Sequence, residues 1–338
     1  MNRVFLLASC WKKIVFPLAV LFLLAALNSG CQGDMEPAEP PEEPGTPGTP
    51  SIPEEIDGGE RQEPVIAVYI AEEGDVTEMP MEEYIEGVVA GEMEPDWPLE
   101  ALAAQAIIAR TFTLQKIAEA GGVPDRDAHA STDIEEFQAY SREDITETVR
   151  QAVEMTRGQV ACHEGSFIRA WFSAYAGPKT ALADEGLNFE EGNPPYIHIV
   201  ESPGETIIPA EEKDWSESFP LESVQAAVSD LTGEDPGSIE DVKIKERGPS
   251  GRAVTLAING QDVPAPDLRL ALGSTEMRST FLEELSLEKD SVNMAGTGYG
   301  HGVGVCQWGA RAMSEGGSSP GEIVNYFYKN IDLVTLWD

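Results

Sequence analysis

The sequence has few basic residues and few cysteines. Among its 338 residues, 22 are lysine or arginine and 60 are aspartate or glutamate, which gives a formal net charge of -38. So negative a surface argues against non-specific binding to nucleic acid or to anionic lipid. Four cysteines without a CxxC pair make neither a disulfide scaffold nor a recognisable zinc spacing. Only Cys162 and Cys306 lie beyond the N-terminal region. A disulfide between them is compatible with an exported protein, and the sequence does not decide whether it forms.

Long hydrophobic runs are also missing, apart from a short one near the N-terminus. Arg3, Lys12 and Lys13 precede an apolar stretch over residues 14–27, which is too short to span a bilayer comfortably. This order is typical of a signal peptide, so we expect residues 1–31 to be a signal peptide or membrane anchor of an exported protein. Small residues and then Cys31 follow, which makes Cys31 a candidate lipidation site. A cleaved ordinary signal and an uncleaved anchor are the alternatives.

Residues 32–64 are rich in proline and glutamate. Eight prolines fall between Pro37 and Pro64, mixed with Glu, Gly and Thr. A segment of this composition cannot bury a hydrophobic core, so we predict a long disordered tether. No second linker of this kind follows, so we expect one domain over residues 65–338.

Within residues 65–338, the patterns mix strands and helices without a strict βαβ rhythm, which favours an α+β fold. We expect strands at 65–70 and within 159–177, and a hairpin over 240–263. A glycine-rich loop at 296–306 completes the pattern. The expected helices cover residues 81–93, 98–118, 223–233, 307–315 and 320–329.

Glu92 stands out in the first of these helices because it lies on the apolar face. That face is formed by residues at the i, i+3, i+4, i+7, i+8 spacing: Met81, Tyr84, Ile85, Val88 and Val89. Burial would raise the pKa of Glu92 toward that of a general acid. Gly87 and Gly91 cost the helix about 1 kcal/mol each, which indicates that another backbone or a ligand comes close. A buried structural ion pair is the alternative role for Glu92.

The second helix and the glycine-rich loop carry the other candidates. Arg110 lies among apolar residues and needs an anionic or carbonyl partner; Glu92 is one candidate partner, and a loop carbonyl or a substrate is another. In the loop, His301 is a candidate for catalysis, binding or structure. His301 and Cys306 could form a thiol–imidazole couple, which would make the protein a thiol hydrolase.

Several stretches together resemble the SpoIID/LytB family, which comprises stage II sporulation protein D and amidase-enhancer relatives. They are "MPMEEYIEGVVAGEM", "WPLEALAAQAIIARTF", "RLALGSTEMRSTF", "GYGHGVGVCQWGARAMSEGG" and "IVNYFYKNIDL". The resemblance implies peptidoglycan binding and lytic transglycosylase action. Under it, Glu92 matches the family's catalytic glutamate, and Gln105, Arg110, His301 and Gln307 match other motif positions, which we assign to substrate binding.

As a lytic transglycosylase, the protein would cleave the bond between N-acetylmuramic acid and N-acetylglucosamine and leave a 1,6-anhydro end. The resemblance leaves open a non-catalytic wall-binding enhancer of an N-acetylmuramoyl-L-alanine amidase. Expected partners are glycan strands, such an amidase, and the membrane through the N-terminal anchor. The expected location is the outer face of the cytoplasmic membrane or the cell wall, in sporulation or in vegetative growth.

Two stretches depart from the family pattern. Some relatives carry a His/Cys zinc site where this sequence reads "DAHASTDIEEFQAY", in which His129 is present without a cysteine. We therefore expect no zinc and no other cofactor. Pro178 stands where the family usually has a second glycine, which affects only a local turn.

Overall fold

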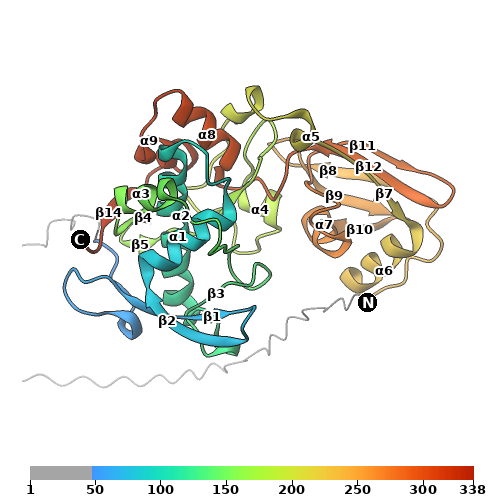
Figure 1. The fold of residues 1–338 in the computed structure, drawn as a ribbon. Helices are drawn as coiled ribbons and strands as arrows, with labels where there is room; N and C mark the ends of the chain where they lie inside the picture. Colours follow the sequence, from blue (N-terminus) through green and yellow to red (C-terminus); the bar gives the residue numbers. More distant parts are fainter. Residues whose placement is uncertain (1–47) are drawn as a thin grey trace, which may run out of the picture. The chain divides into compact units, whose positions relative to one another are not determined.

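The computed structural model of the chain describes residues 48–338 and has the expected α+β fold (Figure 1). The predicted signal region, the lipidation site at Cys31 and linker residues 32–47 lie outside the described residues. No helix within 48–338 combines the length and hydropathy needed to cross a membrane. The α-helices are α1 (Met81–Glu92), α2 (Leu99–Ala120), α3 (Glu147–Met155), α4 (Ala183–Leu187), α5 (Ala210–Lys213), α6 (Leu221–Thr232), α7 (Ala265–Leu272), α8 (Gln307–Glu315) and α9 (Pro320–Phe327).

Three short 3-10 helices and fourteen strands complete the described part of the chain. The 3-10 helices are η1 (Glu54–Ile56), η2 (Pro124–Arg126) and η3 (Pro203–Thr206). The strands are β1 (Val65–Ile70), β2 (Asp75–Pro80), β3 (Ala130–Ser131), β4 (Gln159–His163), β5 (Ser166–Phe167), β6 (Phe172–Ser173), β7 (Asp214–Pro220), β8 (Val242–Arg247), β9 (Ala253–Ile258), β10 (Gln261–Pro264), β11 (Leu282–Leu287), β12 (Ser291–Thr297), β13 (Val305–Cys306) and β14 (Asp332–Thr335).

The strands form five small sheets, with orders β2-β1-β3, β10-β9-β8, β11-β12-β7, β13-β6 and β14-β4-β5. The expected hairpin over 240–263 is the β8-β9-β10 sheet, in which both neighbouring pairs are antiparallel. The strands expected from the sequence do not include those of the β11-β12-β7 sheet. Its strands carry many exposed acidic residues, as in β7, where only two of seven residues are buried, so they lack a clear apolar alternation.

The described residues belong to one compact unit, which contains two hydrophobic cores. The larger core surrounds α2, which packs against α1, α3, β4, α8 and α9. The smaller core lies within residues 215–294 and joins α6 and α7 to the β10-β9-β8 and β11-β12-β7 sheets. Helix α2 can hold this central place because it is apolar on nearly every side.

Proline precedes the first turn of the first two helices, and glycine ends the second helix. Pro80 and Pro98 each precede a helix in extended conformation, where the ring's fixed φ leads into the first turn. Gly121 ends α2 in the left-handed region, with φ 71°. Helix α1 ends at Glu92, so the short link 93–98 turns the chain back into α2 next to that residue.

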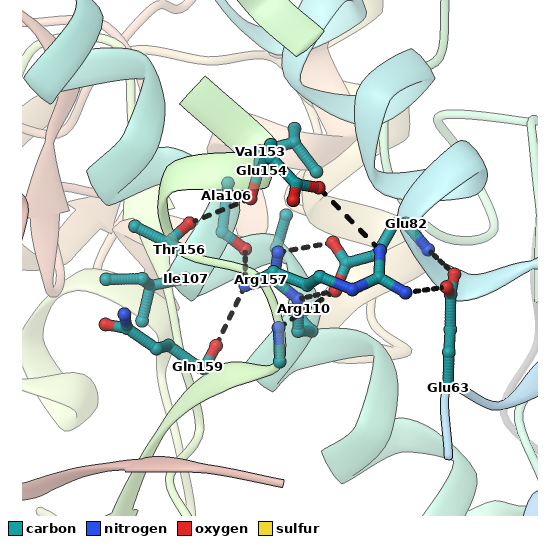
Figure 2. Close-up of polar contacts among 12 residues, drawn as sticks. Glu63, Glu82, Ala106, Ile107, Arg110, Val153, Glu154, Thr156, Arg157 and Gln159 are labelled. Carbon is teal, nitrogen blue, oxygen red and sulfur yellow. Dashed lines mark hydrogen bonds and ion pairs between the residues drawn. The ribbon is translucent and has the colours of Figure 1, made fainter. Parts of the chain in front are cut away.

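A buried ion pair joins the two helices near the start of α1 (Figure 2). Arg110, which is fully buried, donates from Nε to Oε1 of Glu82 (3.0 Å) and from Nη2 to Oε2 of Glu82 (2.5 Å). Another donor of Arg110, Nη1, reaches the carbonyl of Gln159 (2.8 Å). Oε1 of Glu82 also accepts from the N–H of Gly158 (3.0 Å) and from the indole of Trp337 (2.9 Å). The pair therefore ties α1 and α2 to β4 and to the chain beyond β14.

Glu82 is buried, although helical periodicity alone places it on the polar side of α1 with Glu83 and Glu86. Its exposed fraction is 6%. Helical periodicity does not detect this burial, because the compensating charge of Arg110 comes from 28 residues further along the chain.

A second buried polar cluster joins the two cores. Glu185 of α4 accepts from the N–H of Ser250 (3.0 Å), in the link between β8 and β9. Arg252 donates to Ser250 Oγ (2.9 Å) and to the carbonyl of Lys179 (2.9 Å), and burial lowers the pKa of Arg252 to about 10. The link "GPSG" is thus fixed by the larger core on one side and continues into the smaller core on the other.

The folded part begins before residue 65, the predicted start of the domain. Ile56 is buried in the larger core, Ile52 packs against it, and Pro53 is buried between them. The carboxylate of Glu63 accepts from the N–H of Glu82 (2.8 Å) and pairs with Arg157. Residues 48–64 therefore pack on the domain instead of continuing the tether. The sequence did not indicate this, because the two isoleucines stand in a proline-rich stretch.

We predict that Arg110→Met lowers the free energy of unfolding by about 3–5 kcal/mol, because it leaves Glu82 buried without a counter-charge. Urea unfolding of the purified protein measures this. The matched control is Arg150→Met on α3, whose side chain is 53% exposed and whose partner Glu86 is 3.7 Å away; we expect a change within about 0.5 kcal/mol. Equal effects of the two substitutions would contradict the role given to the ion pair.

Candidate active site

A pocket of about 340 Å³ lies where α1 ends and α2 begins. The last residues of α1 and the link to α2 form one side, and Gln307 and Trp308 at the start of α8 line it as well. Ala174 and Asp144 line it from two loops, and Glu212 lines it from α5. The volume falls within the range usual for ligand pockets, about 300–1,000 Å³.

Glu92, the last residue of α1, lines this pocket. Its Oε1 accepts a hydrogen bond from the backbone N–H of Ala139 (2.8 Å). Burial raises the pKa of the carboxyl from 4.5 to about 7, and the Ala139 N–H opposes that rise because it stabilises the ionised form. A carboxyl with such a pKa can give up a proton and take it back near neutral pH.

The expected close approach of another backbone is found at Gly91, whereas Gly87 leaves room for the Tyr140 ring. A Cβ on Gly91 would lie 2.6 Å from the backbone N of Tyr140, and one on Gly87 would lie 2.0 Å from the Tyr140 ring. The N–H of Ser141 donates to the carbonyl of Gly87 (2.9 Å). The segment around residues 139–141 can therefore lie directly on α1 and place the Ala139 amide on Glu92.

Gln307 is the expected binding residue that the structure brings to the same pocket as Glu92. It is the first residue of α8 and is 5% exposed. Within residues 48–338, no hydrogen-bond partner contacts its Nε2. Next to it, Trp308 packs on Trp97 with ring centroids 4.8 Å apart, and the Arg311 guanidinium lies over both rings. This packing fixes the start of α8 against the link that follows Glu92.

Three further carboxylates line the pocket: Glu94, Asp144 and Glu212. No lysine or arginine is among the residues that line it. These three acids give no signal in the sequence, because they are exposed side chains outside any apolar face and nothing separates them from the many other acids of this chain. Cations and developing positive charge are therefore favoured in the pocket.

Gln105 and Arg110, the expected binding residues of α2, do not line this pocket. Arg110 pairs with Glu82, so the pairing with Glu92 that the sequence left open is not formed. Gln105 is 1% exposed, and within the described residues neither of its amide atoms has a hydrogen-bond partner. Both side chains lie inside the helix packing.

His301 lies in the glycine-rich loop and does not line the pocket either. Its Nδ1 accepts from the N–H of Val303 (3.0 Å). Burial and the nearby charges of Arg269 and Arg252 lower the pKa of His301 to about 3, so the ring is neutral at physiological pH. A Cβ on Gly302 would lie 2.1 Å from the Arg252 guanidinium. The loop thus packs closely against protein groups here.

The two cysteines of the described chain, Cys162 and Cys306, are free and buried. The disulfide between them that the sequence allowed is therefore not formed. The Cys306 sulfur accepts from the N–H of Ala176 (3.3 Å) and of Gly309 (3.4 Å) and lies 3.2 Å from Ser202 Oγ. Burial raises the pKa of the Cys306 thiol. A buried neutral thiol that caps α8 is poorly suited to be a nucleophile, which argues against the thiol hydrolase alternative.

No group of three or more His, Cys, Asp and Glu side chains within residues 48–338 is arranged to hold a metal ion. His129, the residue considered for zinc, accepts from the N–H of Ala67 through Nδ1 (3.0 Å). That bond fastens the link before β3 to β1. The absence of zinc stays a prediction.

Comparison with known proteins adds two family matches. The family model of the stage II sporulation protein matches residues 69–163, which include Glu92 and Ala139. A domain of unknown function (DUF8618) matches residues 211–304, nearly the same residues as the smaller core. The pocket receives residues from both matched regions.

Similar whole proteins include a stage II sporulation protein D of Bacillus amyloliquefaciens, 30% identical over 81% of this chain and 80% of the relative. An uncharacterized protein of Brachyspira hyodysenteriae is 31% identical over 77% of this chain and 68% of its own length. An amidase enhancer of Bacillus subtilis (strain 168) is 27% identical over 74% of this chain and 40% of its own length.

We predict that Glu92→Gln stabilises the protein in a pH-dependent manner. The folded state holds the Glu92 proton more tightly than the unfolded chain does, so ionisation between about pH 4.5 and 7 destabilises the folded state. The variant lacks this cost. We expect little change at pH 4 and a gain of roughly 3 kcal/mol above pH 7, measured by urea unfolding. A gain that does not vary with pH would contradict the raised pKa.

Proposed function

Because the chain belongs to the SpoIID/LytB family, we propose that it is a lytic transglycosylase that cleaves peptidoglycan glycan strands, with Glu92 as both acid and base. The observation that carries the proposal is a single carboxyl with a pKa of about 7 in a pocket of ligand size. The wall-related names of the relatives support the substrate.

In the proposed reaction, protonated Glu92 donates its proton to the glycosidic oxygen that leaves C1 of N-acetylmuramic acid. The bond between C1 and that oxygen breaks, and positive charge develops at C1. Ionised Glu92 then takes the proton of the 6-hydroxyl of the same sugar. As that proton leaves, the 6-hydroxyl oxygen bonds to C1. The product is a 1,6-anhydro end, no water is consumed, and Glu92 is protonated again.

Ordinary glycosidases use a second carboxylate to activate water or to form a covalent intermediate. In the proposed reaction the 6-hydroxyl is the nucleophile, so one acid/base group is sufficient. The carboxylates of Glu94, Asp144 and Glu212 would stabilise the positive charge that develops at C1. The Nε2 of Gln307 offers a donor to a hydroxyl or acetamido oxygen of the sugar.

An exported protein that acts in the cell wall fits this function, whether it works in sporulation or in vegetative growth. Its partners would be glycan strands and an amidase. The membrane attachment through residues 1–31 or a lipid on Cys31 belongs to the same proposal.

We predict that the full-length protein releases glycan fragments one water lighter than hydrolysed ends, as read by mass spectrometry. The substrates are glycan strands with and without stem peptides. Glu92→Gln should lower kcat by about 10²–10⁴-fold, because the amide cannot transfer the proton. The matched control, Glu83→Gln, changes an exposed glutamate of the same helix and should retain full activity. Cleavage by Glu92→Gln would mean that another residue is the acid.

A second prediction concerns pH. Since the acid must be protonated, kcat/KM should fall as the pH rises through about 7, the pKa of Glu92. Initial rates on purified glycan between pH 5 and 9 measure this. A rate that stays constant across this range would contradict Glu92 as the acid.

The similarity to the amidase enhancer favours a second candidate, a wall-binding protein that stimulates an amidase without cleaving glycan. This candidate function predicts that neither the wild type nor Glu92→Gln cleaves glycan, while both still bind the strands. Release of stem peptides by an added N-acetylmuramoyl-L-alanine amidase would then increase in the presence of the protein.

A further inference from the structure

The segment that reaches Glu92 has no helix or strand of its own. Residues 132–146 connect β3 to α3 and contain neither. Their central part lies on α1, where Gly87 and Gly91 leave room for it. The amide of Ala139 can therefore point at Glu92 only as long as this irregular segment is held in place.

Gln138 fastens the segment on the side before Ala139, while the Ser141 bond to Gly87 fastens it on the side after. The Gln138 side chain is 2% exposed and points away from the pocket to α2, where Nε2 donates to Thr113 Oγ1 (3.1 Å). Thr113 is fully buried, and its hydroxyl donates to the carbonyl of Ala109 (2.9 Å). The chain from Gln138 through Thr113 to the α2 backbone thus anchors the residue just before Ala139. The ion pair of Glu136 with Arg126 fastens the same segment from its surface side.

The Ala139 bond also distinguishes the two oxygens of Glu92. Oε1 accepts the N–H, so a proton on Oε1 would compete with that bond. Within residues 48–338, no hydrogen-bond donor contacts Oε2. The proton of the acid therefore belongs on Oε2.

We propose that Gln138 is a positioning residue: through Thr113 it holds the Ala139 amide on Oε1 of Glu92 and leaves Oε2 as the oxygen that transfers the proton. This rests on the proposed function of Glu92. Gln138 itself does not line the pocket, so it acts only through Ala139.

None of the other charged or titratable groups around Glu92 stabilises its ionised form as the Ala139 N–H does. Glu94 follows it in the link to α2, Asp144 faces the pocket from the segment before α3, and Glu212 faces it from α5. Tyr84 of α1 is another titratable group near Glu92, and burial raises the pKa of its phenol far above neutral. None of these is a cation, so the Ala139 N–H is the group of this set that favours the ionised form of Glu92.

The test is the pH dependence of kcat/KM for Gln138→Met and Thr113→Val. Each variant removes the anchoring bond while nearly keeping the side-chain volume. Loss of the Ala139 bond should raise the pKa of Glu92, so the fall in activity at high pH should move up by about one pH unit. The double variant should move it no further than either single variant, because both act on one bond.

Gln115→Met is the matched control. Gln115 is also a buried glutamine, 3% exposed, and lies on α2 two residues from Thr113, but it does not line the pocket. Its pH profile should match that of the wild type. Melting curves identify variants that do not fold. If Gln138→Met does not fold, Thr113→Val tests the same bond from its other side.

Titration of the Glu92 carboxyl carbon by NMR, assigned by its loss in Glu92→Gln, separates this inference from the proposed function. If no protein form cleaves glycan but the carboxyl titrates higher in Gln138→Met, the positioning role stands and the transglycosylase proposal fails. If the folded variants keep both the wild-type pH profile and the wild-type titration, Gln138 only fastens the loop and the inference is overturned.

Discussion

The buried ion pair between Glu82 and Arg110 is the interaction on which the rest of the larger core depends. A carboxylate and a guanidinium can leave water together only if nearly all their hydrogen-bonding capacity is satisfied. Here β4, the residue before it and Trp337 supply the remaining partners. These contacts fix α1 against α2. Glu92 lies ten residues further along α1, about 15 Å away, so the same constraint determines where the candidate acid meets the pocket.

The two glutamates of α1 show what the sequence can and cannot predict. Glu92 could be found because it interrupts an apolar face and follows two costly glycines within one helix. Glu82 has neither signal: it stands among other acids on the polar side, and its burial depends on an arginine in the next helix. A local pattern detects conflicts within a single element. It does not detect a charge whose partner is brought near only by folding.

The same distinction holds for the site as a whole. Gln307 was assigned through a family motif, and it does line the pocket with Glu92. Gln105, Arg110 and His301 belonged to equally clear motifs, yet they lie inside the packing around the pocket. Asp144 and Glu212 had no signal because they are exposed acids in an acidic chain, and Gln138 had none because its partner Thr113 lies on a distant helix. The helices around Glu92 were thus predictable, whereas the loops that complete the site were not.

The bond from Trp337 to Glu82 spans 255 residues of sequence. It means that the buried carboxylate near the start of the domain obtains one of its partners only after nearly the whole domain has been synthesised. Closing so long a loop costs conformational entropy, so this contact is expected to form late in folding. Proteolytic loss of Trp337 would remove one of the hydrogen bonds to Glu82 and weaken the packing of α1, so the stability of the first helix depends in part on the chain after β14.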